Sequence, residues 1–202
     1  MEIFLSICLG IGLSAACGFR VFVPLLCLSL AAKFGALPLT PGFAWAGSTT
    51  AVIAFGAATV AEIVAYYIPW VDNALDAIAG PLATIAGVVV MASVLTDIEP
   101  FWRWTLAVIA GGGIAASTQI ATTKARLASS ITTGGFANPV LATIEATSST
   151  VLSVLAVIWP LVALVVVLAI LAVCWMVIWF VGKRVLKMMR GQTETPVLNP
   201  GA

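Results

Sequence analysis

The sequence predicts an all-α membrane protein with about six transmembrane helices, arranged as a 3+3 inverted repeat that contains broken or re-entrant helices. Of its 202 residues, 62% are hydrophobic and 8% are charged, and the mean hydropathy is +1.16. Soluble domains are only about half apolar. The net charge of +1 gives no reason to expect nucleic acid, and the absence of histidine removes the usual proton shuttle and metal ligand.

The first apolar run covers residues 3–32. It opens with Glu2 and has no basic residue before it, so it lacks the basic start of a signal peptide and should be retained. As one straight helix it would be about 45 Å long, which exceeds a hydrocarbon core of about 30 Å. We therefore expect the run either to kink at Pro24 as one tilted helix, or to break near Gly18-Phe19-Arg20 into two half-helices.

The next three spans are marked by stretches without charge. One is expected over residues 47–69, with Glu62 inside its second half. The stretches between Asp76 and Asp97, and between Arg103 and Lys124, carry no charged residue. Each has about the 20 residues that a spanning helix needs.

The last apolar run is too long for one span. Trp159-Pro160 divides it, because proline breaks the hydrogen-bond ladder of a helix. We therefore expect spans over 140–158 and 161–182, followed by a flexible polar tail over 191–202. Residues 1–190 form a single transmembrane domain in this interpretation.

The distribution of basic residues predicts the orientation. A C-terminal cluster should be cytoplasmic under the positive-inside rule; it comprises Lys183, Arg184, Lys187 and Arg190. An even number of spans, six, then places the N-terminus in the cytoplasm too. The membrane is expected to be the inner membrane of a bacterium. Seven tryptophans fall near the expected span ends, as in an aromatic belt.

Two halves, about 1–99 and 100–190, share an order of features. Each has a basic residue, then an acid, then a helix expected to begin at proline: Arg20, Glu62 and Pro81 in the first half, and Lys124 with Arg126, Glu145 and Pro160 in the second. Three-span halves of this kind insert with opposite topology, as in many transporters. A homodimer is expected, because six thin spans bury little surface.

Charged side chains inside the spans are the candidate site, since each costs several kcal/mol and normally has a partner or a function. We expect Arg20 to pair with Glu62, and Lys124 or Arg126 to pair with Glu145. Purely structural pairing is one interpretation. In the other, the cations bind an anionic substrate and the carboxylates take a coupling proton or sodium ion. The candidate substrate-binding residues are Arg20, Glu62, Lys124, Arg126, Asn138 and Glu145.

A polar stretch over 117–139 interrupts the hydrophobic pattern. We expect it to be the end of the fourth span and a cytoplasmic re-entry, with a chain break at Gly134-Gly135. Asn138 before Pro139 should cap the next helix, whose free N–H groups could bind an anion. Lys124 and Arg126 either turn inward toward Glu145 or extend to the headgroups.

Hydroxyls and two aspartates are candidates for ion coupling or gating: Thr122, Thr123, Thr132, Thr133, Asp72 and Asp76. Hydroxyls can replace part of an ion's hydration shell, but small polar residues also pack helices together. Asp72 and Asp76 are four residues apart and could share a helix face toward a metal. They could equally be solvated acids at a helix start. No metal or cofactor is expected.

The chain resembles a family of small bacterial integral membrane proteins known only as a domain of unknown function. The resemblance covers about residues 3–175 and rests on these motifs: Ser14-Ala15-Ala16-Cys17-Gly18-Phe19-Arg20-Val21-Phe22-Val23-Pro24-Leu25-Leu26, Glu62, Ile68-Pro69-Trp70-Val71-Asp72-Asn73-Ala74-Leu75-Asp76, Lys124-Ala125-Arg126, Asn138-Pro139 and Glu145. Three departures from the family pattern remove charge: Ala146 replaces an acid, Tyr66-Tyr67 an Asp-Lys pair and Gly80 an arginine. The resemblance implies no activity.

The function expected from these residues is a small inner-membrane transporter or channel for a small anionic solute or ion. Charged residues of both halves would line its central site. The alternatives are a membrane enzyme acting on lipid or polyprenyl phosphate, with Asp72 and Asp76 holding a metal, or a non-catalytic scaffold. A scaffold should pack dry around Arg20 and Glu62, whereas a transporter should have a water-accessible cavity at its charged residues.

Overall fold

The computed structural model describes residues 2–134, 136–173 and 176, with no account of the side chains at 69, 70, 72 and 73. Every regular element in these ranges is helical. Three helices are long and apolar enough to cross a membrane, and a bent pair, Pro41–Gly47 with Thr49–Ala65, would make a fourth. The membrane helices predicted from the sequence are therefore present, whereas the count of six is not confirmed.

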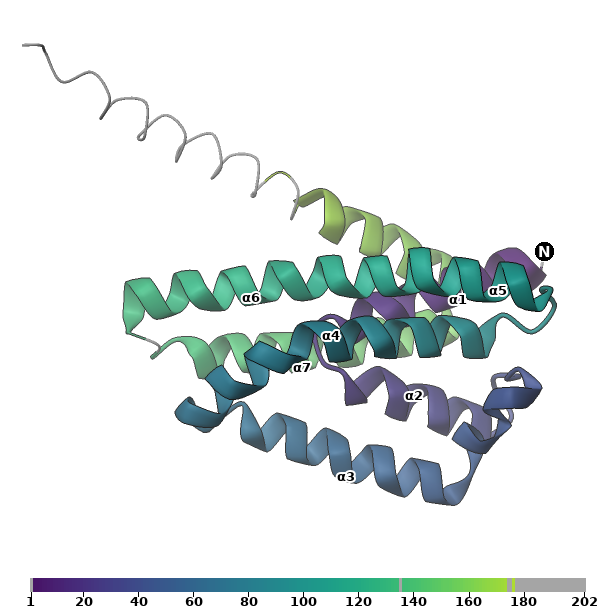
Figure 1. Cartoon of the computed structure of the whole chain (residues 1–202), viewed down its shortest axis with the longest axis horizontal. Helices are drawn as coiled ribbons and strands as arrows, with labels where there is room; N and C mark the ends of the chain where they lie inside the picture. The colour runs from purple at the N-terminus through teal and green to yellow at the C-terminus, as the bar shows by residue number, and fades with distance from the viewer. Residues whose placement is uncertain (1, 135, 174–175, 177–202) are drawn as a thin grey trace, which may run out of the picture. The chain divides into compact units, whose positions relative to one another are not determined.

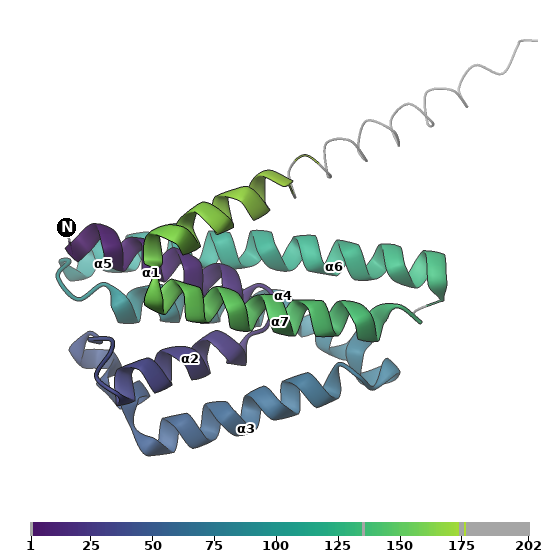
Figure 2. The same ribbon diagram turned by 180° about the vertical axis from the view of Figure 1, so that it is seen from behind.

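The first apolar run forms two short helices, α1 (Glu2–Cys17) and α2 (Phe22–Lys33). Of the two alternatives, the break near Arg20 is the one observed. Figures 1 and 2 show that α2 turns back beside α1, so that the start of α1 and the end of α2 lie at the same end of the bundle. We call this pair the hairpin, and residues 18–21 its tip.

Two longer helices follow the hairpin. A short 3-10 turn, η1 (Pro41–Gly47), precedes α3 (Thr49–Ala65), with a bend of 67° between them. The Ser48 hydroxyl accepts a hydrogen bond from the Ala51 N–H and so caps α3. Helix α4 (Pro69–Val94) starts at a proline and continues through Pro81.

The fourth span is one long helical run. It comprises α5 (Pro100–Leu106), the π-helical η2 (Ala107–Gly112) and α6 (Gly113–Thr133). The polar stretch expected to hold the end of this span is helical up to Thr133, past Lys124 and Arg126. Some of its polar side chains, such as Thr122 and Arg126, are buried, whereas Lys124 and those near the end of the helix are exposed.

The chain reverses after α6 at Gly134, whose φ of 64° lies in the left-handed region that favours glycine. Helix α7 (Asn138–Ile158) follows. Asn138 was expected to cap this helix, but Ala137 occupies the cap position and no side chain caps it. The predicted break at Trp159 is observed, and a further helix covers Pro160–Val173.

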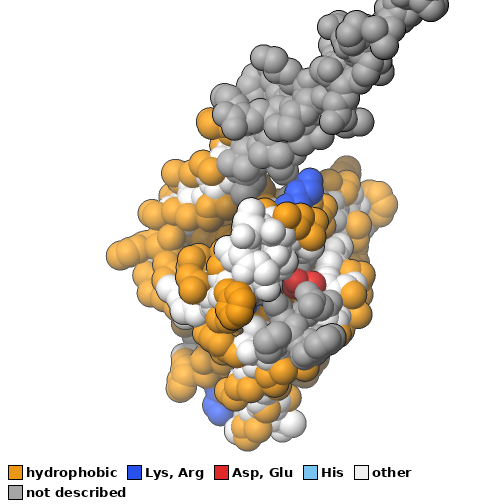
Figure 3. Space-filling model, turned by 90° about the vertical axis from the view of Figure 1, so that its left-hand side faces the viewer, with side chains coloured by type: hydrophobic (Ala, Val, Ile, Leu, Met, Phe, Trp, Pro, Cys, Tyr) orange, Lys and Arg blue, Asp and Glu red, His pale blue; other side chains and the backbone are white. Residues whose placement is uncertain are grey.

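Small residues let the helices pack closely around α1. A Cβ added to Gly87 in α4 would lie 2.6 Å from the Gly111 carbonyl oxygen in η2. A Cβ on Gly12 in α1 would lie 2.7 Å from the Ala156 Cβ in α7. Cys8 and Cys17 are buried here as free thiols. The end-on view shows hydrophobic side chains over much of the part of this face that is drawn in colour (Figure 3).

The inverted repeat is not confirmed. Its two proline-led helices differ, because Pro81 lies inside α4 whereas Pro160 begins a helix after a break. The described tryptophan side chains at positions 45, 102, 104 and 159 are all exposed. Trp175, Trp179, the C-terminal basic cluster and the tail over 191–202 lie outside the described residues.

Candidate functional site

The hairpin tip is fixed against α6 and α7. A Cβ on Gly18 would lie 2.4 Å from the Thr118 Cβ and 2.5 Å from the Ala115 carbonyl oxygen, so only glycine fits here without a shift. The Ser149 hydroxyl of α7 donates to the Ala16 carbonyl at 2.9 Å. The same carbonyl also accepts the N–H groups of Phe19 and Arg20, each at 3.1 Å, so α7 contacts the turn that ends α1.

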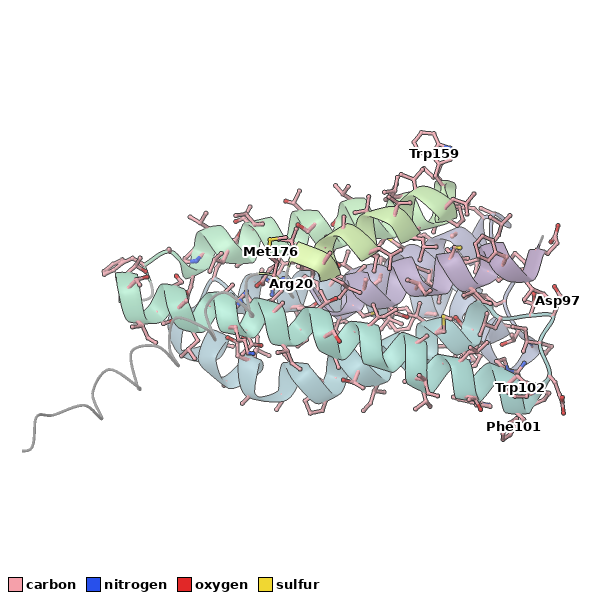
Figure 4. All side chains as sticks on the ribbon, turned by 90° about the horizontal axis from the view of Figure 1, so that it is seen from above. Arg20, Asp97, Phe101, Trp102, Trp159 and Met176 are labelled. Carbon is pink, nitrogen blue, oxygen red and sulfur yellow. The ribbon has the colours of Figure 1, made fainter. Side chains whose placement is uncertain are left out.

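Arg20 extends from this tip into the protein. Its side chain is 2% exposed, and Figure 4 places it within the bundle, away from the end where Asp97 and Trp102 lie. The Nη2 atom donates to the Ala142 carbonyl oxygen at 3.0 Å and lies 3.1 Å from Oε2 of Glu145. A loop residue is thereby held by two groups of α7.

Arg126 and Glu145 form a bidentate ion pair. Arg126 Nε donates to Oε1 of Glu145 at 2.9 Å, and Arg126 Nη2 contacts Oε2. Their exposed fractions are 3% and 7%. The expected contact between α6 and Glu145 is therefore observed, with Arg126 turned inward and Lys124 exposed on the same helix.

Tyr66 completes this cluster, which we call the arginine cluster: Arg20, Tyr66, Arg126 and Glu145. The Cζ atoms of Arg20 and Arg126 lie 3.7 Å and 4.4 Å from the centre of the Tyr66 ring. An aromatic ring attracts cations at such distances. Sequence reasoning treated Tyr66 only as a departure from the family pattern. Its position one helical turn after Glu62 was the available signal.

Glu62 does not pair with Arg20 as expected. Its Oε1 accepts the Val21 N–H at 2.8 Å and its Oε2 accepts the Phe22 N–H at 3.0 Å. The first N–H groups of a helix lack partners within that helix and attract negative charge. The carboxylate therefore caps α2, while Arg20 turns to Glu145 on α7.

Arg20 keeps hydrogen-bonding capacity that the described residues do not use. Its Nε and Nη1 atoms are buried and have no hydrogen-bond partner among them. Buried polar groups are nearly always paired, so each exception requires an explanation such as an ion or a water. Two arginines share the one carboxylate of Glu145, which leaves the arginine cluster positive; Glu62, which is engaged by backbone N–H groups, offsets that charge from nearby.

A pocket of about 330 Å³ lies beside the cluster. Apolar side chains of α2, α3 and α4 form most of its wall, and Glu62 and Tyr66 supply its polar atoms. Arg20, Arg126 and Glu145 are not among its lining residues. The pocket therefore reaches Glu62 directly, and the Tyr66 side chain contacts both the pocket and the Arg20 guanidinium.

The other candidates lie apart from this cluster. Asn138 Nδ2 donates to the Ser130 hydroxyl near the turn between α6 and α7. Thr122, Thr132 and Thr133 donate to carbonyls of their own helix, and Thr123 accepts from Gln119. All four of these hydroxyls are thus engaged within α6, and their role in ion coupling or gating stays a prediction.

Asp72 and Asp76 lie near the start of helix α4. Asp76 is partly buried, and the Asp72 side chain is not described. Within the described ranges, no three Asp, Glu, Cys or His side chains are grouped closely enough to hold a metal ion.

The fold and site together define an all-helical protein with candidate membrane-spanning helices, in which a helical hairpin carries an arginine into a buried charged cluster. The family model of a domain of unknown function, DUF4126, matches residues 7–180, and the chain belongs to this family. The resemblance drawn from the sequence motifs is thereby confirmed. No curated protein and no solved structure shows significant similarity to the chain.

Proposed function

We propose that this protein is a small membrane transporter or channel for a small anionic solute or ion. One observation carries the proposal. Arg20 is buried at the tip of the hairpin, and two of its three guanidinium nitrogens have no hydrogen-bond partner among the described residues. An anion bound there would supply the missing acceptors.

The broken helix supports the same function. Irregular backbone at membrane depth is tolerated only where it is enclosed by protein or lines a cavity. Discontinuous helices form the substrate and ion sites of many secondary transporters, and ionisable residues inside a membrane usually belong to such sites. The tip at residues 18–21 combines both features.

The arginine cluster is closed to solvent, which corresponds to one state of a transport cycle. Arg20 and Arg126 are almost inaccessible, and the pocket beside them ends at Tyr66 and Glu62. We assign this arrangement to an occluded state, in which an anion reaches Arg20 only after the Tyr66 side chain or the hairpin tip moves. Alternating access requires at least one such closed state.

The finer predictions on architecture belong to this proposal. They are the six-span inverted repeat, the homodimer, and a bacterial inner membrane with both termini in the cytoplasm. One Arg and one Glu from each half lie in or beside the cluster, which supports the repeat. Six crossings with both termini in the cytoplasm require the first apolar run to cross the membrane. If α1 and α2 instead re-enter, five crossings remain and the termini lie on opposite sides.

Anion uptake by the purified chain in proteoliposomes tests the function. Chloride, nitrate, phosphate and acetate serve as probes, and Arg20→Gln is compared with the parent protein. Loss of a charge-assisted hydrogen bond of about 1.5–3 kcal/mol should reduce uptake at least about tenfold.

Lys33→Gln is the matched control, because it removes a positive charge from the same hairpin at an exposed position. It should leave uptake within about twofold, since exposed substitutions rarely have large effects. The proposal fails if no probe accumulates above empty liposomes. It also fails if Arg20→Gln, recovered folded, transports as well as Lys33→Gln.

A non-catalytic scaffold is the second candidate, and the near-complete burial of the cluster favours it. Arg20, Arg126 and Glu145 are each less than 10% exposed, as the dry packing of a scaffold requires. In that case the parent protein transports none of the probes, although Arg20→Gln still destabilises the fold.

A further inference from the structure

We infer that Glu62 is a proton-binding site of this protein, and that protonation of its carboxylate releases the hairpin tip that carries Arg20. The inference deepens the proposed function, because it assigns the coupling ion and the residue that binds it. It rests on three features of Glu62: its place in the pocket wall, its two bonds to the tip, and the chemistry of its neighbours.

Glu62 connects the pocket to the tip. The carboxylate lines the pocket of about 330 Å³ and is partly exposed. The same two oxygens accept the N–H groups of Val21 and Phe22, the two residues that follow Arg20. A change in the charge of this carboxylate therefore directly alters the hydrogen bonds that hold the backbone of the tip.

The lining of the pocket favours a proton over a sodium ion. Apart from Glu62 and Tyr66, its lining side chains are Val, Phe, Ala, Leu and Ile. Hard cations such as Ca²⁺ and Mg²⁺ take six or more oxygen ligands, and one carboxylate with one phenol falls far short of such a shell. A proton needs only one oxygen atom.

Glu145 is a poorer site for the proton. It is 7% exposed and contacts both Arg20 and Arg126, whose charges oppose protonation. It is also absent from the lining of the pocket. Glu62 has one nearby arginine, is partly exposed and is bonded to neutral backbone groups, so protonation costs less electrostatically.

The step moves one proton. It comes from bulk water and bonds to one oxygen of Glu62, and the only bond lost is a hydrogen bond from Val21 or Phe22 to that oxygen. A neutral carboxyl group also accepts the remaining N–H bond less strongly than a carboxylate. The tip then loses most of its attachment to α3 and can move with Arg20.

The groups that interact electrostatically with Glu62 come from three parts of the fold. Cys17 and Arg20 lie in the hairpin, Tyr66 lies one turn further along the chain from Glu62, and Glu145 lies on α7. From α4, the residues that line the pocket are Leu75, Ile78, Ala79 and Leu82, none of which is titratable. Arg20 is the one cation among these groups, so protonation of Glu62 also removes a charge that stabilises Arg20.

Amide hydrogen exchange in lipid nanodiscs tests the inference on the full chain without any substrate. Exchange of the peptide that contains Val21 and Phe22 is measured from about pH 4.5 to about pH 9, a range that brackets an ordinary glutamate. After correction for the intrinsic pH dependence of exchange, protection should fall at least about tenfold toward low pH. Glu62→Gln should show low protection that no longer depends on pH.

Glu99→Gln is the matched control, because it neutralises an exposed glutamate at the start of α5 and should keep the parent profile. The inference is overturned if the corrected protection of the parent protein does not change with pH. It is also overturned if Glu62→Gln retains the pH-dependent loss. Absence of anion uptake would instead count against the proposed function alone, because exchange is measured without transport.

Discussion

Individual residues show how far sequence reasoning extends. A pairing of Lys124 or Arg126 with Glu145 was expected, because charged residues at membrane depth need partners, and Arg126 is the partner observed. The prediction that Arg20 pairs with Glu62 was wrong. No sequence pattern indicates that the Glu62 carboxylate would accept hydrogen bonds from backbone N–H groups at the start of α2. A contact between a side chain and the backbone N–H groups of a helix start depends on the exact residue at which that helix begins, and the sequence does not fix this residue.

Glu145 is the common acceptor of two buried arginines, so its neutralisation leaves positive charge without compensation. Removing one partner of a buried ion pair costs about 3–5 kcal/mol. We expect Glu145→Gln to lower the free energy of unfolding by about that amount, measured by denaturant titration in mixed micelles. Glu99→Gln should change it by less than about 0.5 kcal/mol, and equal effects of the two variants would contradict the role of Glu145.

Tyr66 stabilises the cluster through its ring. We expect Tyr66→Phe to retain most of the stability, because the ring face remains over both guanidinium groups. Tyr66→Leu should lose about 1–2 kcal/mol, the scale of a desolvated cation–π contact. Thermal unfolding of the two variants in the same lipid distinguishes them. A Phe variant as unstable as the Leu variant would show that the hydroxyl group matters more than the ring.

At the scale of elements, the break in the first apolar run could be predicted, whereas the direction that α2 takes after the break could not. Length alone rules out one straight helix over 3–32. Whether α2 continues across the membrane or turns back depends on packing against α1, α3 and α7. Close contacts at Gly18 help to fix that choice, and a single glycine in a sequence does not reveal what will approach it.

The close approach at Gly18 has a direct test. Gly18→Ala places a Cβ within 2.4 Å of Thr118 and 2.5 Å of the Ala115 carbonyl oxygen. Overpacking of this kind costs about 1–3 kcal/mol. Gly80→Ala is the matched control, because nothing lies within 4 Å of its added Cβ and alanine favours the helix. Unfolding free energies that do not differ between the two variants would contradict the packed tip.

On the scale of the whole molecule, composition and charge spacing were sufficient to predict an all-helical membrane protein, and the resemblance of its motifs was sufficient to predict its family. They were not sufficient for the arrangement. The polar stretch over 117–139 was expected to be the end of the fourth span and a cytoplasmic re-entry, yet its residues up to Thr133 belong to one continuous helix, α6, in which Arg126 contacts Glu145 of α7. Such contacts join partners distant in the sequence, which spacing along the chain does not indicate.

The most direct test of this account is the sidedness of the first apolar run. Single cysteines at Glu2 and Lys33, in a folded background without the four native cysteines, are labelled from each side of the membrane with an impermeant thiol reagent. A re-entrant hairpin that brings Arg20 into the bundle predicts that both positions react from the same side. Labelling of Lys33 from the side opposite to Glu2 would show that the run crosses the membrane, and would contradict the account.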